Sequence, residues 1–193
     1  LDVGTRLADS WPDVFCFLRD SPSWTDESLA IFLRSIHEQA DYLVRYPKAS
    51  KWLLVESSGL LTAALVFPEF LKAGEWKEIA EVRLDGLATD LILLDGSHAE
   101  GAVSYLIPCL RRFSQAIRLL QMNGSDPSPD LLQASQLGFA YLIGIAEPNL
   151  FLPAINDSDR FYLPDVLNEF GENVPPHPEI EYIRSERAGG VAP

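Results

Sequence analysis

The sequence has few of the residues that build disulfide frameworks or metal centres, with two cysteines and three histidines among 193 residues. Cys16 and Cys109 lie in separate apolar segments, so we expect two buried free thiols rather than a disulfide or a metal site. No two of the histidines, His37, His98 and His177, have the spacing of zinc ligands. The sequence therefore indicates no metal and no cofactor.

Positive charge is also scarce, because 15 lysines and arginines stand against 28 aspartates and glutamates. The net charge is −13 and the isoelectric point is about 4.5. These values exclude the basic footprint of a general nucleic-acid-binding protein. A polyanionic ligand would depend on a local basic cluster, since salt screens exposed charges beyond about 8–10 Å.

No run of apolar residues is long enough to cross a membrane. The most apolar stretch, residues 52–67, is interrupted by Glu56 and the three small residues that follow it. The chain begins with Leu1, and its only methionine is Met122. We therefore expect a processed or excised piece of a longer protein, without a signal peptide.

The composition is that of an ordinary globular domain, with 47% hydrophobic and 22% charged residues. Apolar residues recur at helical spacing through most of the chain, and no β-hairpin signal appears. Thr25 predicts an N-cap, and Pro12 predicts a kink or a helix start. Pro108 is expected near the first turn of its helix. The predicted helices span residues 5–19, 26–46, 52–66, 75–93, 104–122, 127–146, 164–170 and 179–187.

These patterns predict an all-α fold of consecutive antiparallel helix pairs. Periodicity leaves open a helical bundle, an α-solenoid and an (α/α) toroid. Residues 188–193, AGGVAP, have the composition of a linker.

Four segments together are similar to a known enzyme family. They are residues 51–61 (KWLLVESSGLL), 65–70 (LVFPEF) with Trp76, 95–100 (DGSHAE) with Ser104 and Tyr105, and 152–159 (LPAINDSD). In this order they resemble the helical domain of the heparinase II/III-like polysaccharide lyases. The resemblance implies that residues 1–150 form a helical domain, part of an (α/α) toroid or incomplete barrel. It implies that residues 151–193 form an extended segment with short helices and a linker toward a missing β-sandwich domain.

The same resemblance implies cleavage of uronic-acid-containing glycans by β-elimination. This reaction needs a group that neutralises the uronate carboxylate, a base for the C5 proton and an acid for the leaving oxygen. Tyr105 stands at the position of the family's catalytic tyrosine. Ser50 and Lys51 replace the family's neutralising asparagine, and the family's catalytic histidine belongs to the β-sandwich. The implied substrate-binding residues are Ser50, Lys51, Trp52, Glu56, His98 and Glu100.

The site residues also have structural interpretations. Tyr105 could pack at a helix start, Glu56 could be a buried carboxylate with a backbone or basic partner, and Trp52 could fill the core. Two alternative functions stay open. One is a non-catalytic carbohydrate-binding or scaffold domain, and the other is an α/α-toroid glycoside hydrolase that uses Asp95 and Glu100 as its acid/base pair.

We expect the partner to be an acidic polysaccharide or oligosaccharide, of heparan, alginate or another uronate type. Neither nucleic acid nor a membrane is expected as a partner. The family resemblance implies a periplasmic or secreted location. We expect the isolated chain to be inactive and to self-associate through exposed apolar helix faces.

Overall fold

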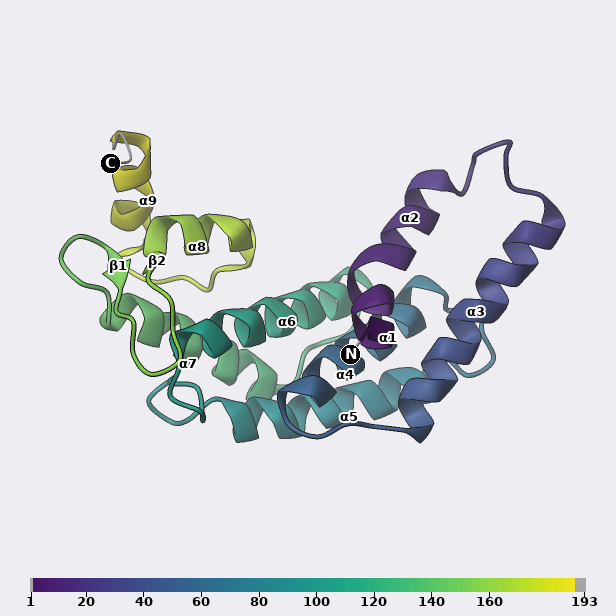
Figure 1. Ribbon diagram of the computed structural model, residues 1–193, viewed down its shortest axis with the longest axis horizontal. Coiled ribbons are helices and arrows are strands. Elements are labelled where there is room, and N and C mark those ends of the chain that lie inside the picture. Colours follow the sequence, from purple (N-terminus) through teal and green to yellow (C-terminus); the bar gives the residue numbers. More distant parts are fainter. Residues whose placement is uncertain (1, 190–193) are drawn as a thin grey trace. The chain divides into compact units, whose positions relative to one another are not determined.

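The computed structural model describes residues 2–189 (Figure 1). Most of its regular structure is helical, and none of the described helices is both long and apolar enough to span a bilayer. The elements are α1 (Asp2–Thr5), the π-helical η1 (Arg6–Ser10), α2 (Trp11–Leu18), α3 (Asp26–Arg45), α4 (Lys51–Val66), α5 (Ala73–Leu91), α6 (Val103–Met122), α7 (Pro129–Gly144), β1 (Phe151–Leu152), β2 (Phe161–Tyr162), α8 (Leu163–Phe170), the 3-10 turn η2 (Gly171–Asn173) and α9 (Ile180–Gly189).

The helix boundaries agree with the predicted ones to within a few residues, and local chemistry explains several of them. Thr25 caps α3 as predicted: its hydroxyl accepts the N–H of Ser28 at 3.1 Å, and the Ser28 hydroxyl accepts the N–H of Thr25 at 3.0 Å. Pro12 lies in the first turn of α2, where its missing N–H is tolerated, and the π-helical η1 ends just before it. Pro108 lies in the second turn of α6 rather than the first.

Three expectations were wrong in detail. β1 and β2 form a short antiparallel ladder that pairs Phe151 with Tyr162; the sequence shows no hairpin signal because a long connection separates the strands. Cys109 is buried as expected, but Cys16 is exposed, because it lies on a solvent-facing side of α2. α9 continues through Gly189, so the first two residues of the predicted linker are helical. Residues 190–193 of that linker lie outside the described residues.

The described chain divides into two compact units. The first runs from the start of the described chain to Leu87 and includes Leu119–Asp126. The second comprises Ala88–Arg118 and the described residues from Pro127 onward. The expected division at residue 150, between a helical domain and an extended segment, stays a prediction.

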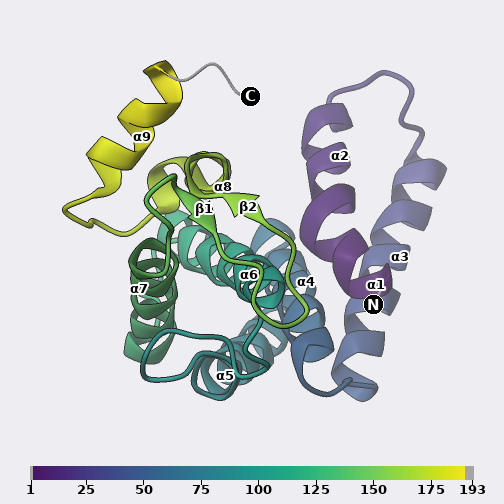
Figure 2. The ribbon, with the colours of Figure 1, turned by 60° about the vertical axis from the view of Figure 1, so that its left-hand side comes forward.

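α4 is the most deeply buried helix of the first unit. It is buried over most of its circumference, as its all-round apolar sequence predicts. α1, η1 and α3 pack against it (Figure 2). Where α1 crosses α4 the two backbones touch, because a Cβ on Gly59 would lie 2.5 Å from the carbonyl oxygen of Gly4. This approach requires glycine at position 59.

A buried carboxylate on α4 holds the connection between α3 and α4. The Glu56 side chain is 1% exposed, and its Oε2 accepts the backbone N–H of Lys48 at 2.8 Å. Arg83 of α5 donates to the carbonyl oxygens of Leu43 at 3.0 Å and Val44 at 3.2 Å. Burial lowers the pKa of the Arg83 guanidinium below its usual value, and the Glu56 carboxylate opposes that shift. One acid and one base therefore secure the end of α3 and the loop that follows it.

Asp41 ties α3 to the start of α5 within the same unit. Its carboxylate accepts the Lys72 ammonium at 2.7 Å and the indole N–H of Trp76 at 3.3 Å. Burial alone would raise the pKa of Asp41, but the hydrogen bonds from Lys72 and Trp76 outweigh it and hold that pKa below its usual value. Trp76 itself is fully buried.

The second unit is built on the packing of α6 against α7. A Cβ on Gly138 of α7 would lie 2.6 Å from a methyl group of Leu110, so the two helices meet at this glycine. Phe139 of α7 makes an edge-to-face contact with Phe170 of α8, with ring centroids 4.8 Å apart. These contacts place the start of α6 beside the segment between β1 and β2, to which it is hydrogen-bonded.

Replacing Gly59 with alanine should destabilise the protein, by roughly 1–3 kcal/mol, because the new methyl group would overlap the Gly4 carbonyl oxygen. Gly86→Ala on α5 is the matched control, since a Cβ there meets nothing within 4 Å. That variant should be neutral or more stable, because alanine favours a helix. Chemical denaturation measures both changes, and equal stabilities for the two variants would contradict the close crossing.

Replacing Glu56 with leucine should lower the free energy of unfolding by about 3–5 kcal/mol, because Arg83 loses its charged partner and the Lys48 N–H loses its acceptor. Glu56→Gln keeps an acceptor of similar shape and should cost roughly 1–2 kcal/mol. Glu78→Gln, an exposed change on α5, serves as the control and should alter the free energy of unfolding little. If Glu56→Leu proved as stable as the control in chemical denaturation, the interactions of Glu56 with the Lys48 N–H and with Arg83 would not stabilise the protein.

Candidate functional site

The predicted site residues fall into two groups, one in each unit of the described chain. Within each group, hydrogen bonds and chain proximity bring the members together. The first group is Ser50, Lys51, Trp52 and Glu56, and the second is His98, Glu100 and Tyr105.

The first group begins with a strained turn at the N-terminus of α4. Ser50 has φ 56° and ψ −144°, in a region that favours glycine. Such backbone strain persists only where the surroundings enforce it, and it clusters at functional sites. Lys51 is the first residue of α4. Trp52 is 47% exposed, so it does not fill the core and one face is open to a ligand.

Glu56 has the structural role that its apolar surroundings suggested. It is buried, its carboxylate accepts the Lys48 N–H, and its charge acts on the Arg83 guanidinium electrostatically. It therefore supports the loop that ends at Ser50 and does not line a surface. The prediction that Glu56 binds substrate directly remains untested, but its contacts explain its presence without a ligand.

In the second group, His98 is buried in the turn between α5 and α6. Its side chain is 1% exposed, and its Nδ1 accepts the backbone N–H of Glu100 at 3.0 Å. The backbone of His98 pairs with Ile92. The imidazole lies 5.9 Å from the Tyr105 ring, centroid to centroid. His98 thus shapes the turn from which Tyr105 follows, while Glu100 is exposed.

Asp95 is arranged as a turn former. Its Oδ1 accepts the N–H of Ser97 at 2.9 Å and the Ser97 hydroxyl at 2.7 Å. These hydrogen bonds hold the pKa of Asp95 below its usual value. The acid of a glycoside hydrolase needs the opposite shift, a raised pKa. In such a pair Asp95 would therefore fit the base and not the acid, and the alternative in which Asp95 and Glu100 form a hydrolytic pair stays a prediction.

Tyr105 is half-buried in the first turn of α6, and its hydroxyl donates a hydrogen bond to Asp157 Oδ2. Asp157 belongs to a short segment, residues 156–159, that we call the 156–159 clasp. Asn156 donates to the Gly101 carbonyl oxygen at 2.8 Å, and the Ser158 hydroxyl accepts the N–H of Ser104 at 3.2 Å. The Asp159 N–H donates to the Ser104 hydroxyl at 3.0 Å. The clasp therefore surrounds the residues that lead into Tyr105.

Sequence reasoning included the clasp in the family-like segments but assigned none of its residues a role. The only signal in the sequence was that four small polar or acidic residues followed an apolar stretch. Nothing in the sequence indicated that Asp157 would meet a phenol 52 positions earlier in the chain.

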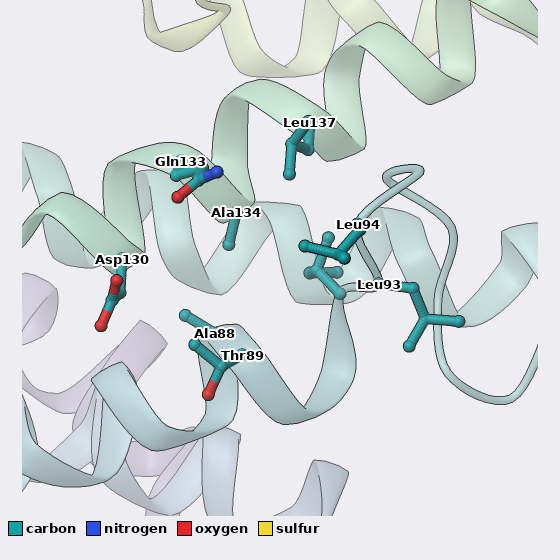
Figure 3. Close-up of a pocket in the computed structure, with 9 residues that line it drawn as sticks. Ala88, Thr89, Leu93, Leu94, Asp130, Gln133, Ala134 and Leu137 are labelled. Atoms are coloured by element: carbon teal, nitrogen blue, oxygen red, sulfur yellow. The ribbon is translucent and has the colours of Figure 1, made fainter.

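The described residues contain no group of three or more potential ligands that could hold a metal ion. The second unit also carries a pocket separate from the predicted residues, lined by the end of α5 and by α7 (Figure 3). Asp130 and Gln133 from α7 lie across from Ala88 and Thr89 of α5, with Leu94 and Leu137 at the apolar end. Its lining mixes apolar and polar side chains and includes none of the predicted site residues.

Known proteins are similar to this chain along its length. The sequence model of the family described as heparinase II/III N-terminus matches residues 1–184. A heparin-sulfate lyase from Bacteroides thetaiotaomicron is 28% identical over 207 residues, which is 100% of this chain and 29% of that protein. A heparin-sulfate lyase from Pedobacter heparinus is 26% identical, over 100% of this chain and 30% of that protein. The chain thus spans less than a third of the length of these relatives.

Solved structures show the same fold. The crystal structure of heparinase III matches with a TM-score of 0.82 and 26% identity, covering 90% of this chain and 28% of that one. The crystal structure of a heparan sulfate lyase from Pedobacter heparinus matches with a TM-score of 0.81 and 25% identity, covering 100% of this chain and 31% of that one. The N-terminal domain of heparinase III is an α/α toroid, so the predicted fold class is confirmed. The chain belongs to the heparinase II/III N-terminus family.

Proposed function

We propose that this chain is the helical domain of a lyase that cleaves uronic-acid-containing glycans by β-elimination, with a heparan-type glycosaminoglycan as substrate. The observation that carries the proposal is the likeness to two heparin-sulfate lyases along the whole chain, including the segments that hold Lys51 and Tyr105. Because the chain covers less than a third of these relatives, the activity belongs to the whole protein. We propose that the isolated chain is inactive.

Tyr105 fits the part of the acid that protonates the leaving oxygen. A phenol donates a proton well when it is neutral and oriented. The Tyr105 ring is half-buried, which limits its motion, and its hydroxyl makes a defined hydrogen bond to Asp157.

Lys51 fits the part of the group that neutralises the uronate carboxylate. An ammonium stabilises the negative charge that develops beside C5 through its own charge, whereas an asparagine does so by hydrogen bonds. The strained turn at Ser50 directly precedes Lys51. The buried Glu56, which accepts the Lys48 N–H and lies in the field of Arg83, supports the loop that leads into that turn. The half-exposed Trp52 next to it offers an aromatic face to a sugar ring.

A polyanionic substrate must overcome the acidic character of the chain. Lys48, Lys51 and Arg45 place positive charge on and beside the Ser50 turn, and Arg45 also pairs with Asp41 at 3.5 Å. Over the Debye length of about 8–10 Å, such a cluster governs the local potential more than the net charge does. This supports acidic glycan binding near Lys51.

The second candidate function is a carbohydrate-binding or scaffold domain without catalysis. The replacement of the family's asparagine by Ser50 and Lys51 favours it. We further propose a periplasmic or secreted location, by likeness to the family. Self-association through exposed apolar side chains such as Phe17, 88% exposed, and Ile31, 60% exposed, also stays a prediction.

Tyr105→Phe in the full-length protein should lower kcat by about 10²–10⁴-fold, because the ring remains but its proton is lost. The measurement is the ultraviolet absorbance of unsaturated uronates released from heparan-type and other uronate polymers. Tyr162→Phe, a half-buried tyrosine of β2 in the same unit, is the control and should retain activity. Absence of product from every polymer with the unaltered protein would support the binding-domain alternative, and full activity of Tyr105→Phe would remove the proposed acid.

Lys51→Ala should reduce kcat by about 10²–10³-fold, because the carboxylate loses its neutralising charge. Lys51→Asn, which restores the family's residue type, should retain much more activity than Lys51→Ala. Lys48→Ala removes another positive charge of the same cluster and leaves the backbone N–H that Glu56 accepts, so it should raise KM and leave kcat nearly unchanged. Equal kcat values of Lys51→Ala and Lys48→Ala would show that Lys51 is not the neutralising group.

A further inference from the structure

The hydroxyl of Tyr105 is directed by a carboxylate far along the chain. It donates to Asp157 Oδ2, and both residues lie in the second unit. Asp157 is exposed, so burial does not hold its carboxylate beside the phenol. The carboxylate can orient the Tyr105 hydroxyl only if the backbone around Asp157 is held in place.

The 156–159 clasp supplies that fixation. Asn156 adopts φ 53°, a left-handed conformation that asparagine tolerates better than most residues. Its amide donates to the carbonyl oxygen of Gly101, which itself has φ 67°. Ser104 is held twice, through its N–H by the Ser158 hydroxyl and through its own hydroxyl by the Asp159 N–H. Asp157 lies between these anchors, so its position relative to the start of α6 is determined by three hydrogen bonds besides its own.

A carboxylate that accepts a hydrogen bond from a phenol has two effects on that phenol. It fixes the direction of the O–H bond, and its negative charge disfavours the phenolate, so the proton stays on the oxygen to higher pH. The lone pairs of the phenol oxygen then point away from Asp157. A tyrosine in this state stays neutral and is poorly suited to act as a base. To protonate the leaving oxygen, its O–H turns from Asp157 toward the substrate.

We propose that Asp157 is a positioning residue that orients the Tyr105 hydroxyl and keeps it protonated. This inference rests on the proposed function, in which Tyr105 protonates the leaving oxygen. It adds that Tyr105 enters the reaction as a neutral phenol, so that another group must remove the C5 proton. The backbone of the clasp then supports the site, and none of its side chains other than Asp157 needs to act on Tyr105.

The test compares Asp157→Asn with Asp159→Asn in the full-length protein. Asparagine at position 157 can still accept a hydrogen bond from the phenol but carries no charge, so Tyr105 should ionise about one pH unit lower. The Asp159 carboxylate makes none of the clasp contacts, because that residue takes part through its backbone N–H. Asp159→Asn should therefore leave the ionisation unchanged. The readout is the ultraviolet tyrosinate spectrum, with the contribution of Tyr105 isolated by subtracting the matching Tyr105→Phe variant.

The same variants are then assayed for turnover across pH. The alkaline limb of kcat/KM should move to lower pH in Asp157→Asn, and Asp157→Ala, which lacks the acceptor as well, should lose about 10²-fold in kcat. An unchanged tyrosinate titration in Asp157→Asn would overturn the inference whether or not the protein turns over substrate. If no polymer is cleaved, the proposed function fails while the titration still decides the role of Asp157. Should Asp157→Ala fail to fold, Asp157→Asn alone decides it.

Discussion

A carboxylate inside an apolar helix is the constraint around which the first unit is arranged. Glu56 is buried on α4, where an uncompensated charge would be very unfavourable. The chain meets this requirement with a backbone N–H from Lys48 and a guanidinium from Arg83. Because Arg83 also holds the last carbonyl oxygens of α3, the compensation of one charge fixes where α3 ends and how the chain enters α4. The strained turn at Ser50 and the position of Lys51 follow from that entry.

In the second unit, neutral and charged hydrogen bonds likewise fix how the chain enters a helix, here α6. There the start of α6 is surrounded by the 156–159 clasp, and Tyr105 meets Asp157. In both units a functional candidate stands at or next to the first residues of a helix, and a partner remote in sequence secures the preceding turn. A rigid helix start defines the direction of a side chain better than a loop does. The roles proposed for Lys51 and Tyr105 require such a defined direction of the side chain.

Elements governed by their neighbours in sequence were predicted well. The capping box at Thr25 and the all-round apolar pattern of α4 depend on residues within about four positions, so the sequence displays them directly. The β1–β2 pair was missed because two-residue strands leave no periodic signal. The exposure of Cys16 was missed because apolar neighbours do not reveal which side of a helix remains uncovered.

The sequence by itself determined the helical class, the family and the identity of Tyr105 and Lys51 as candidates. Composition and helical spacing suffice for the helical class, whereas the family and the two candidates came from the resemblance of the ordered segments to known lyases. Only the tertiary structure decided that Glu56 supports a turn, that Trp52 stays half-exposed and that Asp157 accepts a hydrogen bond from the Tyr105 hydroxyl. These contacts join residues 8 or 52 positions apart or depend on which helix face is covered. Such distances are closed by the packing of whole helices, which no local pattern in the sequence encodes.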